Sequence, residues 1–192
     1  MPELPPHSFE PEDRAAWRNW LARHHADLAS VWLVLHKKSA GPVNLSTPEA
    51  VEEALCFGWI DSKPRRLDQW RSLLYFAPRK VGSGWSAVNK ARIAKLAASG
   101  LLHPAGLARI EAAKQDGSWS LLGSADALEV PPDLRLALEA SGGLEHWNAF
   151  PRGVRRGILE WTLQAKTAPT RAKRIEETAS RAAKNERANQ WR

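Results

Sequence analysis

The residues best suited to chemistry lie between positions 55 and 95, where tryptophans alternate with basic and hydroxyl side chains. Aromatic faces beside guanidinium and ammonium groups suit a partner that is anionic and also has a flat apolar surface. Nine Lys and Arg residues stand against two Asp residues here, so the segment carries a charge of +7. The alternative is a solvated basic hairpin over a Trp-rich core, and the residue types leave both interpretations open.

The order of these residues predicts an anion-binding pocket. Trp59 and Asp61 are two residues apart and therefore share one face of a strand. Ser83 is expected to cap a helix whose first amides and dipole favour an anion. The predicted ligand-binding residues are Trp59, Asp61, Arg79, Lys80, Ser83, Trp85, Ser86, Asn89 and Lys90. In the alternative, Ser83 only caps the helix, Arg79 pairs with Asp61, and both tryptophans belong to the core.

No catalytic or cofactor motif accompanies this set. The segment Gly84–Val88 lacks the second glycine of a nucleophile elbow, and there is no glycine-rich nucleotide loop. The six histidines show no paired spacing for a metal. Asp61 could serve as a general base only with a raised pKa, whereas nearby cations lower it. The sequence therefore favours a non-catalytic binding protein without metal or cofactor, with an enzyme acting on a small anionic substrate as an alternative.

Four short motifs resemble the YdeI/OmdA family, often described as bacteriocin-protection proteins. They are Cys56–Ser62, Phe76–Lys80, Ser83–Ser86 and Asn89-Lys90. Further similar positions are Trp32-Leu33, Lys37-Lys38, Gly117–Trp119, Ala165-Lys166, Thr170-Arg171 and Arg174-Ile175, so the resemblance extends over almost the whole chain. It implies a small bacterial protein with a role in protection against bacteriocins, antimicrobial peptides or envelope stress. It implies no agreed catalytic residue or cofactor.

A second basic region follows Pro151, where 11 Lys and Arg stand against 4 Asp and Glu. Together with the hairpin it makes nucleic-acid binding an alternative function. The residues predicted for that alternative are Arg65, Arg66, Arg171, Lys173, Arg174, Arg181, Lys184 and Arg187. The predicted partners are thus a small anionic ligand or a nucleic acid, with a protein partner possible. Since the tail has few large apolar residues, we expect the segment after Ala179 to face solvent and to be dispensable for folding.

Composition narrows the class of protein further. The chain has 192 residues and a net charge of +7, and its single cysteine, Cys56, excludes an intrachain disulfide. No apolar run approaches the ~18 residues of a membrane span. The first residues are proline-rich and acidic, unlike a signal peptide. These features lead us to expect a cytoplasmic location.

Hydrophobic periodicity predicts an α+β fold: a small, mainly antiparallel sheet of about three strands, packed by helices, with a helical C-terminal part. Pro64 indicates an edge strand or a bulge. We expect residues 1–120 to form the α+β core and residues 121–192 the helical region, together one compact unit. The expected strands are 30–38, 59–67 and 70–77, and the expected helices include 11–28, one capped by Thr47, 83–100, 104–117, 131–140, 151–166 and 169–189.

Overall fold

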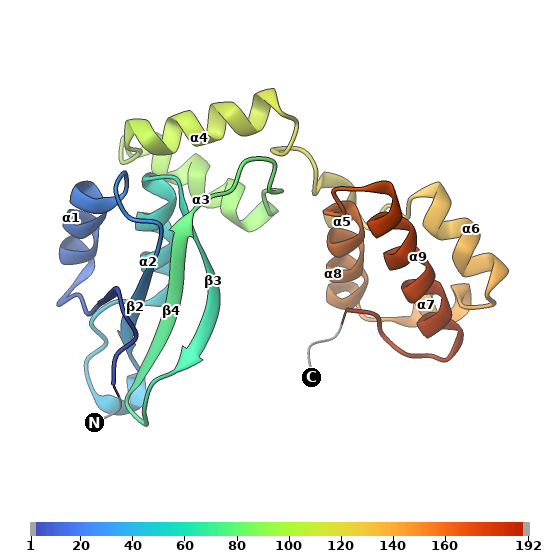
Figure 1. Ribbon diagram of the computed structural model, residues 1–192, viewed down its shortest axis with the longest axis horizontal. Helices are drawn as coiled ribbons and strands as arrows, with labels where there is room; N and C mark the ends of the chain where they lie inside the picture. The colour runs from blue at the N-terminus through green and yellow to red at the C-terminus, as the bar shows by residue number, and fades with distance from the viewer. Residues whose placement is uncertain (1–2, 190–192) are drawn as a thin grey trace. The chain divides into compact units, whose positions relative to one another are not determined.

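The computed structural model describes residues 3–189 and divides into two compact units. The N-terminal unit comprises residues up to 82 together with 88–116, and the C-terminal unit comprises 83–87 together with 117 onward. Figure 1 draws the first in blue to yellow-green and most of the second in yellow to red. The chain therefore contributes the short segment 83–87 to the C-terminal unit before completing the N-terminal one. Whether the two units form one compact body, as expected from the sequence, stays a prediction.

One mixed sheet of four strands organises the N-terminal unit. Its order is β1 (Ser8–Phe9), β2 (Val31–His36), β4 (Arg71–Pro78) and β3 (Trp59–Arg66). β1 runs parallel to β2, whereas β2, β4 and β3 are antiparallel neighbours. The α+β class is confirmed, but the expected count of three strands was one too low. The added strand has only two residues, too few to show any alternation in the sequence.

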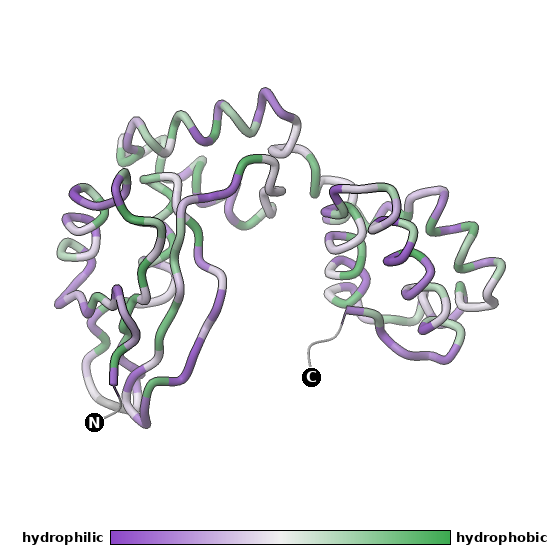
Figure 2. Tube along the Cα trace, viewed as in Figure 1, coloured by the Kyte–Doolittle hydropathy of each residue, from purple (hydrophilic) through white to green (hydrophobic). Residues whose placement is uncertain are grey.

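β3 is an edge strand and carries an irregularity, as Pro64 predicted. Asp61 pairs with Phe76 and Pro64 with Leu74, so two residues of β3 lie opposite Tyr75 alone. Proline cannot donate to a ladder and is therefore confined to edges and bulges. Figure 2 shows that β3 is largely hydrophilic, whereas β4 beside it and β2 beyond β4 contain hydrophobic stretches.

Two helices cover one face of this sheet: α1 (Arg14–His24) and α2 (Thr47–Cys56). The Trp17 ring lies 5.4 Å from the Phe76 ring, and its Nε1 donates to the Ala50 carbonyl oxygen at 3.0 Å. The cap of α2 is Ser46 rather than the expected Thr47. Ser46 and Glu49 form a capping box, in which each side chain accepts from the other's backbone N–H. A 3-10 turn, Lys38–Ala40, separates β2 from this helix.

The N-terminal unit is completed by α3 (Ala87–Ala98) and α4 (Pro104–Gln115). The expected helix start at Ser83 was wrong, because helical backbone begins only at Ala87. In α3, Ile93 and Leu96 are buried, whereas Val88 is 58% exposed. α4 approaches the end of α2 closely at Gly106, where a Cβ would meet the backbone of Cys56.

The C-terminal unit is helical, as expected. It contains α5 (Gly123–Asp126), α6 (Pro132–Ala140), α7 (Leu144–Ala149), α8 (Arg152–Leu163) and α9 (Ala168–Ala183). Its core is built around Trp147, Leu138 and Leu159. Ala182 and Ala188 belong to the same core, with 0% and 1% exposure. Most of the described residues after Ala179 are exposed, as expected, but Ala182 and Ala188 depart from that expectation because they pack into the core. No helix among residues 3–189 is long and apolar enough to cross a membrane.

Candidate anion-binding surface

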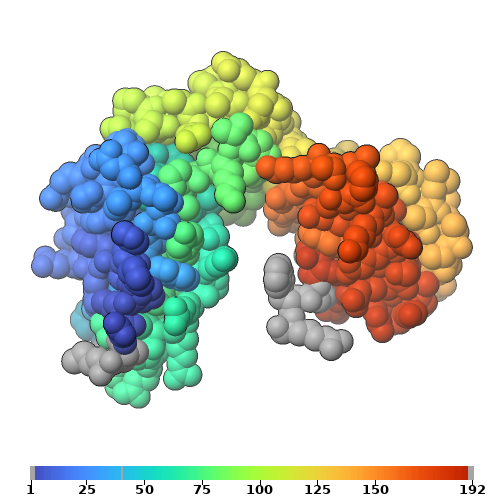
Figure 3. All heavy atoms as spheres, viewed as in Figure 1, coloured from blue at the N-terminus to red at the C-terminus, as the bar shows by residue number. Residues whose placement is uncertain are grey.

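Three cations, Lys63, Arg65 and Arg66, line the outer strand of the sheet, and we call them the basic edge. All three side chains are exposed. Within residues 3–189 none of them forms an ion pair, in contrast to Arg71 on the neighbouring strand, which pairs with Glu10 and Asp68. β3 is held by its ladder with β4, so these charges project from ordered backbone. In Figure 3 the blue-green hairpin of β3 and β4 reaches the surface of the N-terminal unit.

The turn at the end of the hairpin presents an aromatic ring beside the basic edge. Asp68 fixes this turn, because one of its carboxylate oxygens accepts from the backbone N–H of Trp70 at 2.8 Å and of Arg71 at 2.6 Å. Burial raises the pKa of Asp68, but these hydrogen bonds and the Arg71 guanidinium outweigh it and hold the pKa below its usual value. The Trp70 side chain is 50% exposed and lines a hollow of about 390 Å³ together with Glu10, His36 and Arg71.

The face of the sheet opposite α1 and α2 carries a second aromatic pair. Trp32 and Tyr75 are register partners on β2 and β4, and their rings lie 4.9 Å apart at 66°. Both side chains are partly exposed. They alternate along their strands with Leu33 and Phe76, which are buried on the helix-covered face. The irregular stretch of β3 that contains Lys63 lies opposite Tyr75.

Part of the predicted pocket lies at the other end of the hairpin. Trp59 is buried, and its Nε1 donates to the His25 carbonyl oxygen at 3.1 Å. Arg79 is 7% exposed, and its backbone N–H donates to the Gly58 carbonyl oxygen at 2.9 Å. Burial lowers the pKa of Arg79 to about 10, against the opposing influence of the Asp61 charge. The role of Asp61 as a general base stays a prediction.

The remaining predicted pocket residues are divided between the two units. Lys80, Asn89 and Lys90 belong to the N-terminal unit, whereas Ser83, Trp85 and Ser86 belong to the C-terminal one. Within the latter, Trp85 is buried with its ring 5.1 Å from that of Trp119. Segment 83–86 is not the first turn of a helix, so the predicted helix amides for an anion do not lie there. The pocket as a whole stays a prediction.

Three of the four arginines predicted for a nucleic-acid stripe on the tail have partners inside the C-terminal unit. Arg171 forms a two-pronged ion pair with Asp133, with distances of 2.7 and 2.9 Å. Arg174 donates to the Trp161 carbonyl oxygen and lies 5.0 Å from that ring. Arg181 pairs with two glutamates. Lys173, Lys184 and Arg187 form no ion pair among the described residues, and all three are exposed.

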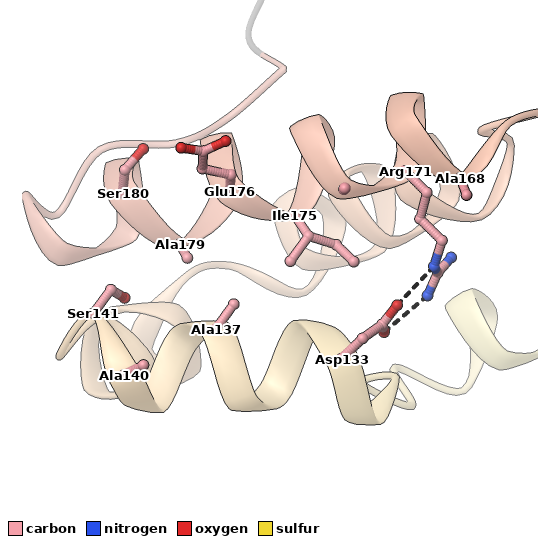
Figure 4. Close-up of a pocket in the computed structure, with 11 residues that line it drawn as sticks. Asp133, Ala137, Ala140, Ser141, Ala168, Arg171, Ile175, Glu176, Ala179 and Ser180 are labelled. Atoms are coloured by element: carbon pink, nitrogen blue, oxygen red, sulfur yellow. Dashed lines mark hydrogen bonds and ion pairs between the residues drawn. The ribbon is translucent and has the colours of Figure 1, made fainter.

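The C-terminal unit contains a groove of about 730 Å³ between α6 and α9. Figure 4 shows alanines and Ile175 along it, with Asp133 and Arg171 facing each other at one end. Its one arginine is already paired, so the groove does not share the chemistry of the basic edge. Among residues 3–189 no group of three or more His, Cys, Asp or Glu side chains could hold a metal ion.

Residues 9–109 match a family model described as a domain of unknown function, DUF8412, which covers more than half of the chain. The chain belongs to this family. Residues 127–185, within the C-terminal unit, match a second model, described as "Bacteriocin-protection, YdeI or OmpD-Associated". The resemblance to the YdeI/OmdA family is thereby confirmed. No curated protein and no solved structure matches the chain.

The motifs that resemble the YdeI/OmdA family do not all lie in the segment that matches the YdeI/OmdA model. Positions 165-166, 170-171 and 174-175 lie inside the YdeI/OmdA match, whereas the motifs between residues 56 and 90 lie inside the DUF8412 match. The YdeI/OmdA model therefore covers a smaller part of the chain than the resemblance suggested. The basic edge and the aromatic pair both belong to the DUF8412 segment.

The sequence predicted Arg65 and Arg66 as binding residues, but not Lys63, Trp32, Tyr75 or Trp70. The segment 30–38 is apolar at nearly every position, which favoured a strand covered on both faces. Only the pairing of β2 with β4 assigns Trp32 and Tyr75 to the same, partly exposed face. Their common position was therefore not readable from either strand alone.

Proposed function

We propose that this YdeI/OmdA-type protein is a non-catalytic binding protein that recognises an anionic partner through the basic edge. The observation that supports this most directly is the charge state of the edge. Lys63, Arg65 and Arg66 are exposed, and none is neutralised by a carboxylate among residues 3–189. Three such charges within four residues of one strand create a local positive potential that attracts anions.

An edge strand also benefits from charge for a different reason. Cations and proline on an edge discourage pairing with the sheet of another molecule, and β3 has both. Charges of either sign can fill that protective role, whereas recognition of an anion requires positive charges at these positions. Charge reversal therefore separates the two roles, because glutamates would protect the edge equally well.

The matched family description speaks of bacteriocin protection. We propose that this protein contributes to such protection, or to the response to envelope stress, indirectly, by binding its anionic partner. A cytoplasmic location, expected from the composition, stays a prediction. We also propose, from the sequence pattern of the predicted pocket, that Arg79 contributes to holding a small anion.

The test is retention of the full-length protein on immobilised heparin, a sulfated polyanion, in a salt gradient. A variant with Lys63, Arg65 and Arg66 changed to Glu should elute at clearly lower salt than the wild type. The tail offers a matched control, since changing Lys173, Lys184 and Arg187 to Glu alters the net charge equally. Equal losses in both variants would assign binding to overall charge. A loss confined to the tail variant would assign binding to the tail and overturn the proposal.

The contribution of Arg79 needs a separate measurement. Thermal unfolding of the wild type in the presence of phosphate, nucleotides and acidic metabolites should reveal at least one anion that raises the melting temperature. Arg79→Gln should abolish that increase while leaving heparin retention unchanged. If none of these anions changes the melting temperature of the wild type, Arg79 has a purely structural role.

A further inference from the structure

The face of the N-terminal sheet that carries Trp32 and Tyr75 combines partly exposed aromatic rings with unpaired positive charge, although Val34 and Leu73 on the same face are buried. Trp32 and Tyr75 stand side by side on this face, each partly exposed, and their edge-to-face contact leaves ring surface available. Arg65 lies opposite Leu73, two residues from Tyr75 on the same face, and the stretch of β3 containing Lys63 lies opposite Tyr75 itself. The aromatic pair is therefore bordered by Lys63 and Arg65, whereas Arg66, opposite Ser72, belongs to the other face.

The same face continues toward the hairpin turn. His36 and Arg71 are register partners there, and they line the hollow of about 390 Å³ together with the half-exposed Trp70. Arg71 and Tyr75 are four positions apart on β4, which corresponds to about 13 Å along an extended strand. The rings are thus spread over a length that can accommodate more than one planar group.

We infer that this face binds single-stranded nucleic acid. Bases stack on Trp32 and Tyr75, while backbone phosphates are neutralised by Lys63 and Arg65. The inference rests on the proposed function and narrows its anionic partner to one class. The rings distinguish this partner from other polyanions, because every base has a π-face and stacking on aromatic side chains tolerates any sequence.

A duplex fits this surface less well than a single strand. Its bases are stacked on each other and hidden from a flat sheet, so a duplex would use the cations but not the rings. Inorganic polyphosphate likewise offers charge without planar groups. Sheets that present aromatic side chains beside basic ones are a recurrent solution for binding unstacked bases.

The experiment measures fluorescence anisotropy of a labelled oligothymidylate of about 16 nucleotides, the upper end of the site size of one small domain. The full-length wild type should bind this probe at least about tenfold more tightly than a duplex of the same length. Tyr75→Leu should weaken binding by about fivefold or more, as expected when one base loses its stacking partner. Tyr75→Phe retains the ring and should bind like the wild type.

Salt dependence gives a second readout that does not involve the rings. Each phosphate contact on a single strand adds about −0.7 to the slope of log affinity against log salt, so Arg65→Gln should reduce the slope by about that amount. Lys95→Gln, an exposed cation on α3, should leave it unchanged. The melting temperature of each variant verifies that it is folded.

The outcomes separate this inference from the proposed function. Equal affinity for the oligonucleotide, the duplex and polyphosphate would overturn the stacking role, while the basic edge would remain an anion-binding surface. The same conclusion follows if Tyr75→Leu is folded and binds like the wild type. If the wild type binds neither heparin nor the oligonucleotide, both proposals fail.

Discussion

Substitution of Gly106 in α4 tests how closely α4 packs against the end of α2. A Cβ at this position would lie 2.2 Å from the carbonyl oxygen of Cys56 and 3.0 Å from that of Leu55. Both are backbone atoms at the end of α2, so no side chain can rotate away. Since non-bonded heavy atoms are comfortable near about 3.5 Å, α2 and α4 would have to separate by about 1 Å.

The size of the effect follows from three contributions. Forcing one methyl group into a packed contact costs about 1–3 kcal/mol. Separation of the helices would also stretch the hydrogen bond from the His103 N–H to the Cys56 carbonyl oxygen, now 3.1 Å and worth about 1 kcal/mol. The higher helix propensity of alanine offsets up to about 1 kcal/mol of this loss of stability. Gly106→Ala should therefore lower the free energy of unfolding by about 1–3 kcal/mol.

Gly157 of α8 provides the matched control, because a Cβ there would meet no atom within 4 Å. Gly157→Ala should raise the free energy of unfolding by about 0.5–1 kcal/mol. Urea unfolding followed by far-UV circular dichroism, with each variant compared with the wild type, measures both changes. A Gly106→Ala variant as stable as the wild type would refute the close approach of α2 and α4. Equal destabilisation by both substitutions would show that the contact is not the cause.

Three further predictions concern other parts of the structure, and each is measured by urea unfolding. Glu53 is buried and accepts from two arginines of α1 at 2.6 Å each, so Glu53→Gln should cost about 1–3 kcal/mol; an unchanged stability would contradict these contacts. Ala182→Glu should lower the free energy of unfolding by about 3 kcal/mol or more, because it buries a charge. Lys184→Glu changes an exposed position and should leave the stability nearly unchanged. Equal effects of the two substitutions would contradict the packing of the tail against the core. Arg171 lowers the pKa of Asp133 below 3.8, so the pair adds stability above that pH and loses it as the pH falls through the lower folded-state value. The stability difference between wild type and Arg171→Gln should therefore close in strong acid, and a difference that persists there would contradict this assignment.

The hairpin could be predicted because several local signals agree. The sequence predicted two strands at 59–67 and 70–77, and the structure has them at Trp59–Arg66 and Arg71–Pro78. Pro64 correctly indicated an edge strand with an irregularity, since the missing amide donor is a property of the residue itself. Local chemistry therefore determined both the elements and their pairing here.

The segment 83–87 shows where local signals fail. Ser83 followed by a glycine and an apolar run satisfies the usual pattern of a helix cap, yet the helix starts at Ala87. Gly84 instead packs against Leu122, and Trp85 against Trp119, both far along the chain. Contacts with residues more than 30 positions away determined this segment, and no window of local sequence contains them.

The two basic regions illustrate why composition alone could not locate a binding surface. Each carries a charge of +7 in the sequence, and so they looked equivalent. In the fold, Arg171, Arg174 and Arg181 of the tail are occupied by Asp133, Trp161 and glutamates. Binding an external anion at these three arginines would require breaking internal contacts, whereas the basic edge has none to break among residues 3–189. Lys173, Lys184 and Arg187 of the tail are also exposed and form no ion pair among the described residues, but they are spread over 15 residues of the chain. The three cations of the basic edge lie within four residues of one strand, so their positive potential is more concentrated, which favours the hairpin over the tail.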